Sequence, residues 1–400
     1  MIKFRRITKT MSTTMLATAL VLGMSGINNV ETVSAKSKNS TKYEKTYLAS
    51  KHENVSYDDE GNVTYKYLVT YKYNKHGQIL NKKETTTNYS GDEESIHTVE
   101  EKNTYWKNGN LKSHVLKAKD KYGQSTYINK YDKYENETYG ETVIEHTGGE
   151  YKSISKYVSK SKNTYSKGNL KKRKTISERY NTTYSSQGEL VPSGKTESVI
   201  TYKYKGKKER ISIDETKDYY YDSVKAEYIP SGTSVYKYVD KYVYKKGVLR
   251  KKTTYTEHKN LDINGKVVNK SDFRISSKTT YDKKGRELKV LSYRDNGKVS
   301  YMSTHRYNKK HIVKYSTKMY DEDGKITSGS ETINYPSGKY AGLAKTSKTI
   351  NSDGTVTKYT YKYKLDKHKN MVKGTSYSDK KVRAVSKYSK YKKYKVKVEK

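Results

Sequence analysis

The residues best suited to chemistry lie near the C-terminal end of the sequence. Between positions 355 and 400 there are sixteen basic residues against three acidic ones, a net charge of +13. Lysine ammonium groups bind the backbone of polyanions, and interleaved tyrosine rings stack on bases or sugars. The predicted polyanion-binding residues are Lys387, Tyr388, Lys390, Tyr391, Lys392, Lys393, Tyr394, Lys395 and Lys397. An alternative of equal weight is a terminal edge strand whose lysines prevent edge-to-edge aggregation.

No other residues have the spacing of a catalytic or metal site. The motifs G-x-S-x-G and H-E-x-x-H and a phosphate-cradling glycine loop are absent from the sequence. The nine histidines are scattered, and only His305 and His311 are near each other, at an even spacing that would place them on one strand face. The turn at Asp262 imitates a calcium loop whose frame would start at Asn260, but Ser271 stands where that loop requires Glu. We therefore expect no catalytic residue, no metal, no cofactor and no enzymatic activity.

Residues 1–35 have the organisation of a secretory signal peptide. Four basic residues precede an apolar run over 15–27, which ends before the cleavage-type sequence Val33-Ser34-Ala35. The run is shorter than the roughly 20 residues that a membrane span needs, so we expect no transmembrane segment in the mature chain. Residues 36–42 form a short flexible lead. Because the chain has no cysteine and no sorting-type signal, retention on a cell wall would depend on charge.

The phrase Y-x-x-x-G followed by a polar and an aliphatic residue recurs through residues 43–363. Glycine accepts a positive φ, so each copy predicts a β-hairpin turn. All three prolines occur in the tripeptide Pro-Ser-Gly, at Pro192, Pro230 and Pro336, and these predict turns as well. The clearest copies of the phrase begin at Tyr57, Tyr73, Tyr105, Tyr184, Tyr281, Tyr293 and Tyr320.

Between the turns, tyrosine alternates with lysine or threonine at the period of a β-strand. Segments 65–73 and 359–365 place tyrosines on one face and lysines on the other. Hydrophobic residues make up only 32% of the chain and 45 residues are Tyr, which favours thin sheets over an aliphatic core. The strand from Val235 has valines opposite tyrosines, which predicts two-layer packing around 199–290. The predicted fold is all-β, an extended antiparallel meander of hairpins that is single-layered and partly two-layered.

The segment 279–310 resembles YD repeats, the β-hairpin repeats of Rhs-type shells and bacterial wall-associated proteins. Tyr281, Asp282, Gly285 and Arg286 match the Y-D-x-x-G-R core of that family. The residues from Tyr320 match it with Lys325 in place of the arginine, and those from Tyr57 with Asn62. The resemblance implies repeated hairpins in an exported bacterial protein, with the basic Tyr/Lys-rich segment 364–400 following the repeat region.

Charge then decides between the functional hypotheses. The full chain carries +40, and loss of residues 1–35, with four basic residues and Glu31, leaves +37. Such a field attracts polyanions. We expect a secreted, non-enzymatic protein that binds an anionic envelope or matrix polymer: teichoic acid, extracellular DNA or an acidic glycan. The alternatives are an exported toxin or antagonist that uses the repeats as a scaffold, and a hydrolase of wall polymer. The sequence leaves the oligomeric state open.

Overall fold

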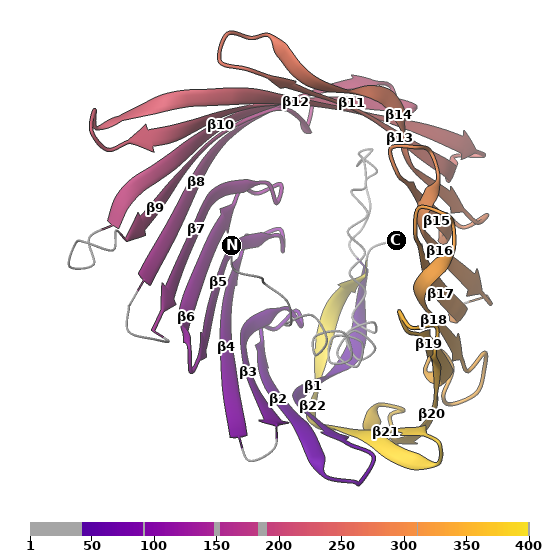
Figure 1. Ribbon diagram of the computed structural model, residues 1–400. Coiled ribbons are helices and arrows are strands. Elements are labelled where there is room, and N and C mark those ends of the chain that lie inside the picture. The colour runs from indigo at the N-terminus through magenta and orange to yellow at the C-terminus, as the bar shows by residue number, and fades with distance from the viewer. Residues whose placement is uncertain (1–41, 91–92, 148–152, 183–189, 310, 399–400) are drawn as a thin grey trace. The chain divides into compact units, whose positions relative to one another are not determined.

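One antiparallel sheet of 22 strands accounts for the described part of the chain (Figure 1). The computed structural model describes residues 42–90, 93–147, 153–182, 190–309 and 311–398, so the predicted signal peptide and most of the predicted flexible lead lie outside the described residues. Residues Glu44–Val396 form one compact unit, and the fold below is that unit's. The strands are β1 (Lys42–Tyr57), β2 (Val63–Tyr73), β3 (Ile79–Ser90), β4 (Glu93–Tyr105), β5 (Leu111–Asp120), β6 (Gly123–Tyr131), β7 (Glu137–His146), β8 (Ser153–Ser166), β9 (Asn169–Thr182), β10 (Leu190–Lys205), β11 (Glu209–Asp222), β12 (Glu227–Lys245), β13 (Val248–Leu261), β14 (Val267–Tyr281), β15 (Glu287–Tyr293), β16 (Val299–Tyr307), β17 (Ile312–Tyr320), β18 (Ile326–Asn334), β19 (Ala344–Ile350), β20 (Val356–Leu365), β21 (Met371–Ser378) and β22 (Lys381–Val398).

The sheet is closed, which corrects the open meander predicted from the sequence. Each strand pairs with the next along the chain, and β1 also pairs with β22, so the first and last strands complete a barrel. All-β structure and repeated hairpins are confirmed. The single-layer open sheet is wrong, because residues more than 300 positions apart supply the closing pair and no local pattern encodes that register.

The repeated turn gives the sheet its curvature. In the turn after Tyr281, the Asp282 carboxylate accepts hydrogen bonds from the backbone N–H groups of Lys284 (2.7 Å) and Arg286 (3.0 Å), and Gly285 has φ = 78°. The strand register shifts beside the tyrosine of the phrase, at Tyr281 as at Tyr57 and at other copies. Such bulges bend a strand and increase its twist, so a bulge repeated at many turns curves the sheet toward closure.

Tyrosine hydroxyl groups tie several hairpins to a neighbouring one. The Tyr105 hydroxyl donates to the carbonyl of Ile79 (2.7 Å), and the Tyr73 hydroxyl donates to that of Ala49 (2.8 Å). We call these bonds tyrosine latches. Burial raises the pKa of Tyr105 to about 12, so its hydroxyl remains a donor at neutral pH. The latches need the phenolic oxygen, which agrees with 45 Tyr and only two Phe in the chain.

The two faces of the sheet differ in composition. Burial alternates along β2 and β20 as the sequence predicted, with tyrosines half-buried and lysines exposed. Strand register places buried serines and threonines of the other strands on the same face as these tyrosines. We call this the hydroxyl face. Side chains converge on the inner surface of a closed sheet, so this heavier burial is expected of the inner face. The buried hydroxyl residues on this face include Ser159, Ser177, Thr279, Ser303 and Ser347.

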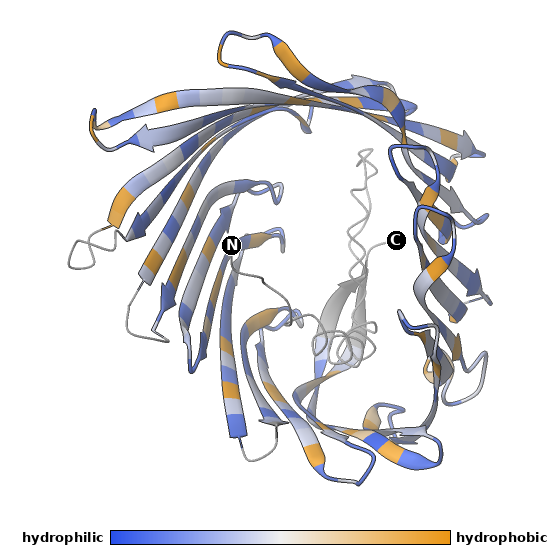
Figure 2. Cartoon of the chain, viewed as in Figure 1, coloured by the Kyte–Doolittle hydropathy of each residue, from blue (hydrophilic) through white to orange (hydrophobic). Residues whose placement is uncertain are grey.

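Among the described residues, no second layer covers the strands between 199 and 290, which corrects that prediction. Strands β10 to β14 pair side by side in the same sheet. Val239 is nevertheless only 5% exposed, because neighbouring side chains on the same face of the sheet cover it. The Lys241 ammonium lies 5.1 Å from the Tyr255 ring, which stacks on Phe273 with centroids 5.2 Å apart. Lateral cover by lysine stems and rings replaces a packed core, and Figure 2 shows hydrophobic residues scattered along the strands.

Two of the three Pro-Ser-Gly tripeptides are bulges within strands, not turns. The register shifts between Pro192 and Gly194 in β10, and opposite Pro230 in β12. A bulge leaves one residue unpaired and tolerates proline without losing a ladder hydrogen bond. Only Pro336 lies in a connection between strands, β18 and β19.

Candidate functional site: the basic face of the C-terminal strands

The predicted polyanion-binding run lies in β22, which is not an edge strand. It pairs with β21 on one side and with β1 on the other. The alternative reading of its lysines as edge protection is therefore wrong. Lys387, Lys390, Lys392 and Lys393 are exposed, whereas Tyr388, Tyr391 and Tyr394 are half-buried; the side chains of Lys395 and Lys397 lie outside the described residues.

The tyrosines of this run are engaged in closing the sheet. Tyr388 stacks on His52 of β1 with ring centroids 4.2 Å apart and planes at 5°. The Tyr391 hydroxyl donates to the Met371 carbonyl at 2.5 Å, and burial raises the pKa of Tyr391 to about 12. Lys390 has a positive φ of 54°, and such a residue interrupts strand alternation, which lets tyrosines three positions apart share a face.

In β20, tyrosines and lysines face opposite ways. Tyr361 and Tyr363 lie on the hydroxyl face, where the Tyr361 hydroxyl meets Ser347 (2.7 Å). Lys362 and Lys364 alternate with them and are exposed on the other face. One ligand therefore cannot be bound by ammonium groups and stacked on the alternating rings at the same time, as the interleaved sequence had suggested.

Three lysines meet on the exposed face across three neighbouring strands. Lys364 of β20 lies directly opposite Lys373 of β21, which lies directly opposite Lys387 of β22. We call these three residues the lysine row. All three are exposed, and none forms a salt bridge among the described residues. Cβ atoms of directly opposed residues are about 5 Å apart, and like charges at that spacing repel.

The local carboxylates do not neutralise the row. Asp366 accepts the backbone N–H groups of His368 (2.8 Å) and Asn370 (2.9 Å), which fixes the turn between β20 and β21. Asp379, in the turn before β22, receives the Ser378 hydroxyl. The nearest acid along the row is Glu53 of β1, whose pKa is lowered chiefly by its hydrogen bond to Lys51 and further by Lys387. Among the described residues, no acid is paired with Lys364 or Lys373, whereas Glu53 lies beside Lys387 at the β1 end of the row.

The sequence could not have identified this row, because its members are separated by nine and fourteen positions. Only the register of β20, β21 and β22 brings them together. The clustering of basic residues after position 355 covers the same strands, but the run predicted from it includes Tyr388 and Tyr391, whose side chains are used within the fold.

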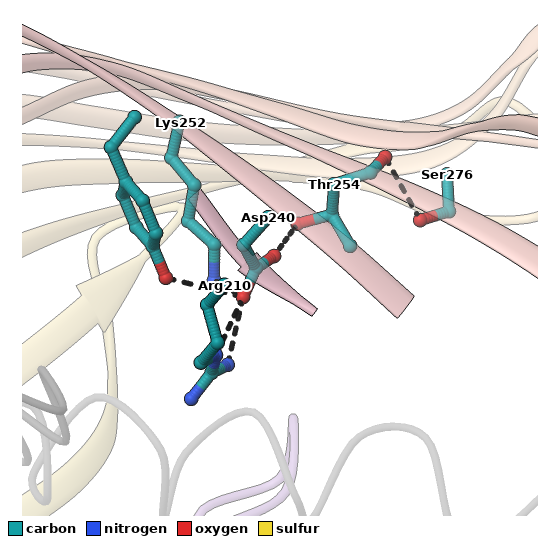
Figure 3. Close-up of polar contacts among 6 residues, drawn as sticks. Arg210, Asp240, Lys252, Thr254 and Ser276 are labelled. Atoms are coloured by element: carbon teal, nitrogen blue, oxygen red, sulfur yellow. Dashed lines mark hydrogen bonds and ion pairs between the residues drawn. The ribbon is translucent and has the colours of Figure 1, made fainter. Parts of the chain in front are cut away.

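The most buried charged cluster is a different kind of site (Figure 3). Asp240 is 4% exposed, and its carboxylate contacts Arg210 (2.7 Å), Lys252 (3.3 Å) and the Thr254 hydroxyl (2.7 Å). Burial alone would raise the pKa of Asp240, but Thr254 and the two cations outweigh it and lower the pKa. Both carboxylate oxygens are occupied, so this cluster joins β11, β12 and β13 and offers nothing to a ligand.

The described residues contain no group of three or more His, Asp or Glu side chains placed to hold a metal ion. His305 and His311 are not on one strand face, because β16 ends at Tyr307 and His311 lies in the connection that follows. His305 packs on the Tyr315 ring at 4.7 Å, and burial lowers its pKa. Asp262 accepts two backbone N–H groups of its own turn at 2.9 Å, which accounts for the calcium-like sequence.

A depression of about 350 Å³ lies beside the bulge at Pro230. Two of its lining residues, Ser234 and Asn260, bond to each other at 3.1 Å. Within the part of the chain that the structure describes, no helix has the length and apolar character to cross a membrane.

Comparisons with known proteins leave the chain without a family. No protein-family model matches it, and no curated protein matches it. Among solved structures, a porin-like protein from Bacteroides uniformis is similar at 11% identity over 85% of this chain and 96% of its own, with a TM-score of 0.24. A porin-like protein from Bacteroides vulgatus has 11% identity over 76% of this chain and 96% of its own, with a TM-score of 0.16. The structure of TcdB2-TccC3 has 10% identity over 84% of this chain and 25% of its own, with a TM-score of 0.13. Similarities of this strength do not assign a function.

Proposed function

We propose that the protein is a secreted, non-enzymatic β-repeat protein that binds an anionic polymer of the cell envelope or matrix. The observation that carries the proposal is the lysine row, where Lys364, Lys373 and Lys387 face solvent together while the acids of the same segment are used in turns. Neighbouring like charges favour association with a polyanion, because its charges relieve their repulsion.

The repeat architecture supports a scaffold role for the remainder of the chain. We propose that its hairpins are degenerate YD repeats, because the residues that match the Y-D-x-x-G-R core hold the turns of this fold in place. Asp282 fixes its turn, and the Arg286 guanidinium pairs with that carboxylate (2.6 Å) and donates to the Asn308 carbonyl (3.1 Å) in another turn. These residues hold hairpins together, which leaves binding to the strand faces.

Association driven by distributed lysines must depend on salt. Binding that releases condensed counterions weakens steeply as salt rises, by up to about one power of the salt concentration for each contact. Isolated cell envelopes mixed with the purified full chain should retain it at low salt and release it at high salt. Retention unaffected by molar salt would contradict the proposal, and so would a failure to bind teichoic acid, DNA and acidic glycan alike at low salt.

A further inference from the structure

The exposed face beside the lysine row lacks a platform for stacking. The tyrosines of β20 and the Tyr388 ring belong to the hydroxyl face. Tyr377 is the described ring on the lysine face of β20, β21 and β22, and it is only half-exposed, with the Lys362 ammonium 5.2 Å from its centroid. Single-stranded nucleic acids gain about 1–3 kcal/mol for each base stacked on an aromatic ring. With Tyr377 as its one described ring, and that ring half-exposed, this face offers no platform on which successive bases could stack.

The row also has a definite length and direction. Strands lie about 4.8 Å apart, so the three lysines span about 10 Å across the strands. The row ends at β1, where Glu53 lies within the electrostatic reach of Lys387. It begins at Lys364, which has no paired residue on β19. Strand β19 starts at Ala344, and its pairing with β20 runs from Thr346 opposite Thr360 to Ile350 opposite Val356. A linear ligand would therefore cross three strands and meet one charge on each.

All three members of the row are lysines. An ammonium group is a compact point charge that donates in any direction, which suits tetrahedral phosphate groups met at varied angles. The two-pronged guanidinium group of arginine adds a fixed bidentate geometry, which suits planar carboxylates as well as phosphates and which the row does not provide. The arginine nearest in β22, Arg383, is already paired with Asp59 at 2.6 Å.

We propose that the lysine row is the binding site for a base-free polymer of repeating phosphate groups, in which successive phosphates contact Lys364, Lys373 and Lys387. This inference rests on the proposed function and gives it a site and a ligand class. Recognition is by the spacing of charge, with no contribution from bases or sugar rings.

The test compares two variants that lose equal charge. In the row variant, Lys364→Gln, Lys373→Gln and Lys387→Gln remove the site. The control variant replaces three exposed turn lysines, Lys75, Lys207 and Lys283, by glutamine. Affinities of the full chain are measured for glycerol-phosphate polymer, inorganic polyphosphate, oligo-dT and polygalacturonate between 50 and 200 mM salt. Those salt concentrations span the range over which phosphate contacts change affinity by orders of magnitude.

We expect the row variant to bind both phosphate polymers about tenfold or more weakly, with the slope of log affinity against log salt reduced by about 2–3. The control variant should lose much less affinity. Equal losses in both variants would show that only net charge matters and would overturn the site. Tighter binding of oligo-dT, or equal binding of polygalacturonate, would overturn the ligand class.

Two further results separate the site from the function and from folding. If the unmodified chain binds none of the four polymers at low salt, the proposed function itself fails. If it binds them and the row variant binds equally well, only the site fails. Replacing the three row lysines by arginine keeps the charge and the fold, so this variant should bind phosphate polymers like the unmodified chain and should gain affinity for polygalacturonate. Loss of phosphate binding in the arginine variant would contradict recognition by the spacing of charge.

Discussion

The pairing of the first and last strands can be locked by a single engineered disulfide. The Ser386 hydroxyl of β22 meets the Asn54 side chain of β1 at 2.9 Å, so the two residues face each other across the closing seam. The chain contains no cysteine, so Asn54→Cys with Ser386→Cys creates one possible bond and no competing pair. Opposed residues have Cβ atoms about 5 Å apart, and a disulfide requires about 4 Å, so only a small backbone adjustment is needed.

The expected stabilisation is large because the closed loop is long. The two positions are 332 residues apart. The chain-entropy relation then gives about 6 kcal/mol at 25 °C as an upper bound, since native-state strain reduces it. An open sheet would bring these residues together only by chance, so the crosslink would neither form efficiently nor stabilise the fold.

The assay is oxidation of dilute protein followed by non-reducing electrophoresis, mass measurement and urea denaturation. Ser161→Cys with Thr175→Cys is the positive control, because these hydroxyls lie 2.8 Å apart on consecutive strands and pair in an open or closed sheet. Asn54→Cys with Ser303→Cys is the negative control, because these positions share the hydroxyl face on strands that do not pair. The closed fold is refuted if the positive control crosslinks while the seam pair stays reduced or links only separate molecules.

Three further substitutions test the latches, the seam and the turns. Tyr105→Phe removes the hydrogen bond to the Ile79 carbonyl and should lower the free energy of unfolding by about 1 kcal/mol in urea titrations. Burial lowers the pKa of His52 to about 4, with a smaller opposing effect of Glu53, so the folded state excludes the proton that the unfolded state binds. Stability should therefore be constant above about pH 6.5 and fall by about 3 kcal/mol toward pH 4, and His52→Phe should flatten that dependence. Lys369 has φ = 64° at the position glycine occupies in other turns. Lys369→Gly should therefore raise the free energy of unfolding, measured by urea titration, by about 1 kcal/mol.

Each of these substitutions has a matched control. Tyr220 is 50% exposed, and Tyr220→Phe should leave the free energy of unfolding unchanged. His146 is exposed, so His146→Phe should retain the pH dependence of the unmodified protein. Lys367 belongs to the same turn as Lys369 without a positive φ, and Lys367→Gly should destabilise the protein. Equal effects of a substitution and its control would show that composition rather than geometry sets stability.

Local features of the fold could be predicted because the turn phrase encodes them. Alternation along β2 and β20 places tyrosines and lysines as expected, and the turn at Tyr281 has the predicted glycine with positive φ. Two turns of the same hydrogen-bonding pattern were missed, because Glu135 and Lys369 occupy the glycine position. The aspartate at the start of each of these turns could have predicted it, since an Asp side chain fixes such a turn whatever residue adopts the positive φ.

Closure could not be predicted, because it depends on curvature added up over many hairpins. Each bulge is local, but the pairing of β1 with β22 follows only when their combined bending returns the last strand to the first. The same limit applies to the lysine row, whose members become neighbours through the register of β20, β21 and β22. Strand periodicity shows which residues share a face, and only pairing shows which of them lie side by side.

Closure also separates the tyrosines of an alternating strand from its lysines. A closed sheet has an inner and an outer surface, so a period of two sends every tyrosine of β20 to one surface and every lysine to the other. The tyrosines then serve the fold, as in the seam stack of Tyr388 on His52, and the lysines remain available to a ligand. The two classes of substitution should therefore separate in experiment. Tyr388→Ala should lower stability without changing the salt dependence of polymer binding, whereas Lys373→Gln should reduce that dependence and leave stability unchanged or higher, because a repulsion is removed.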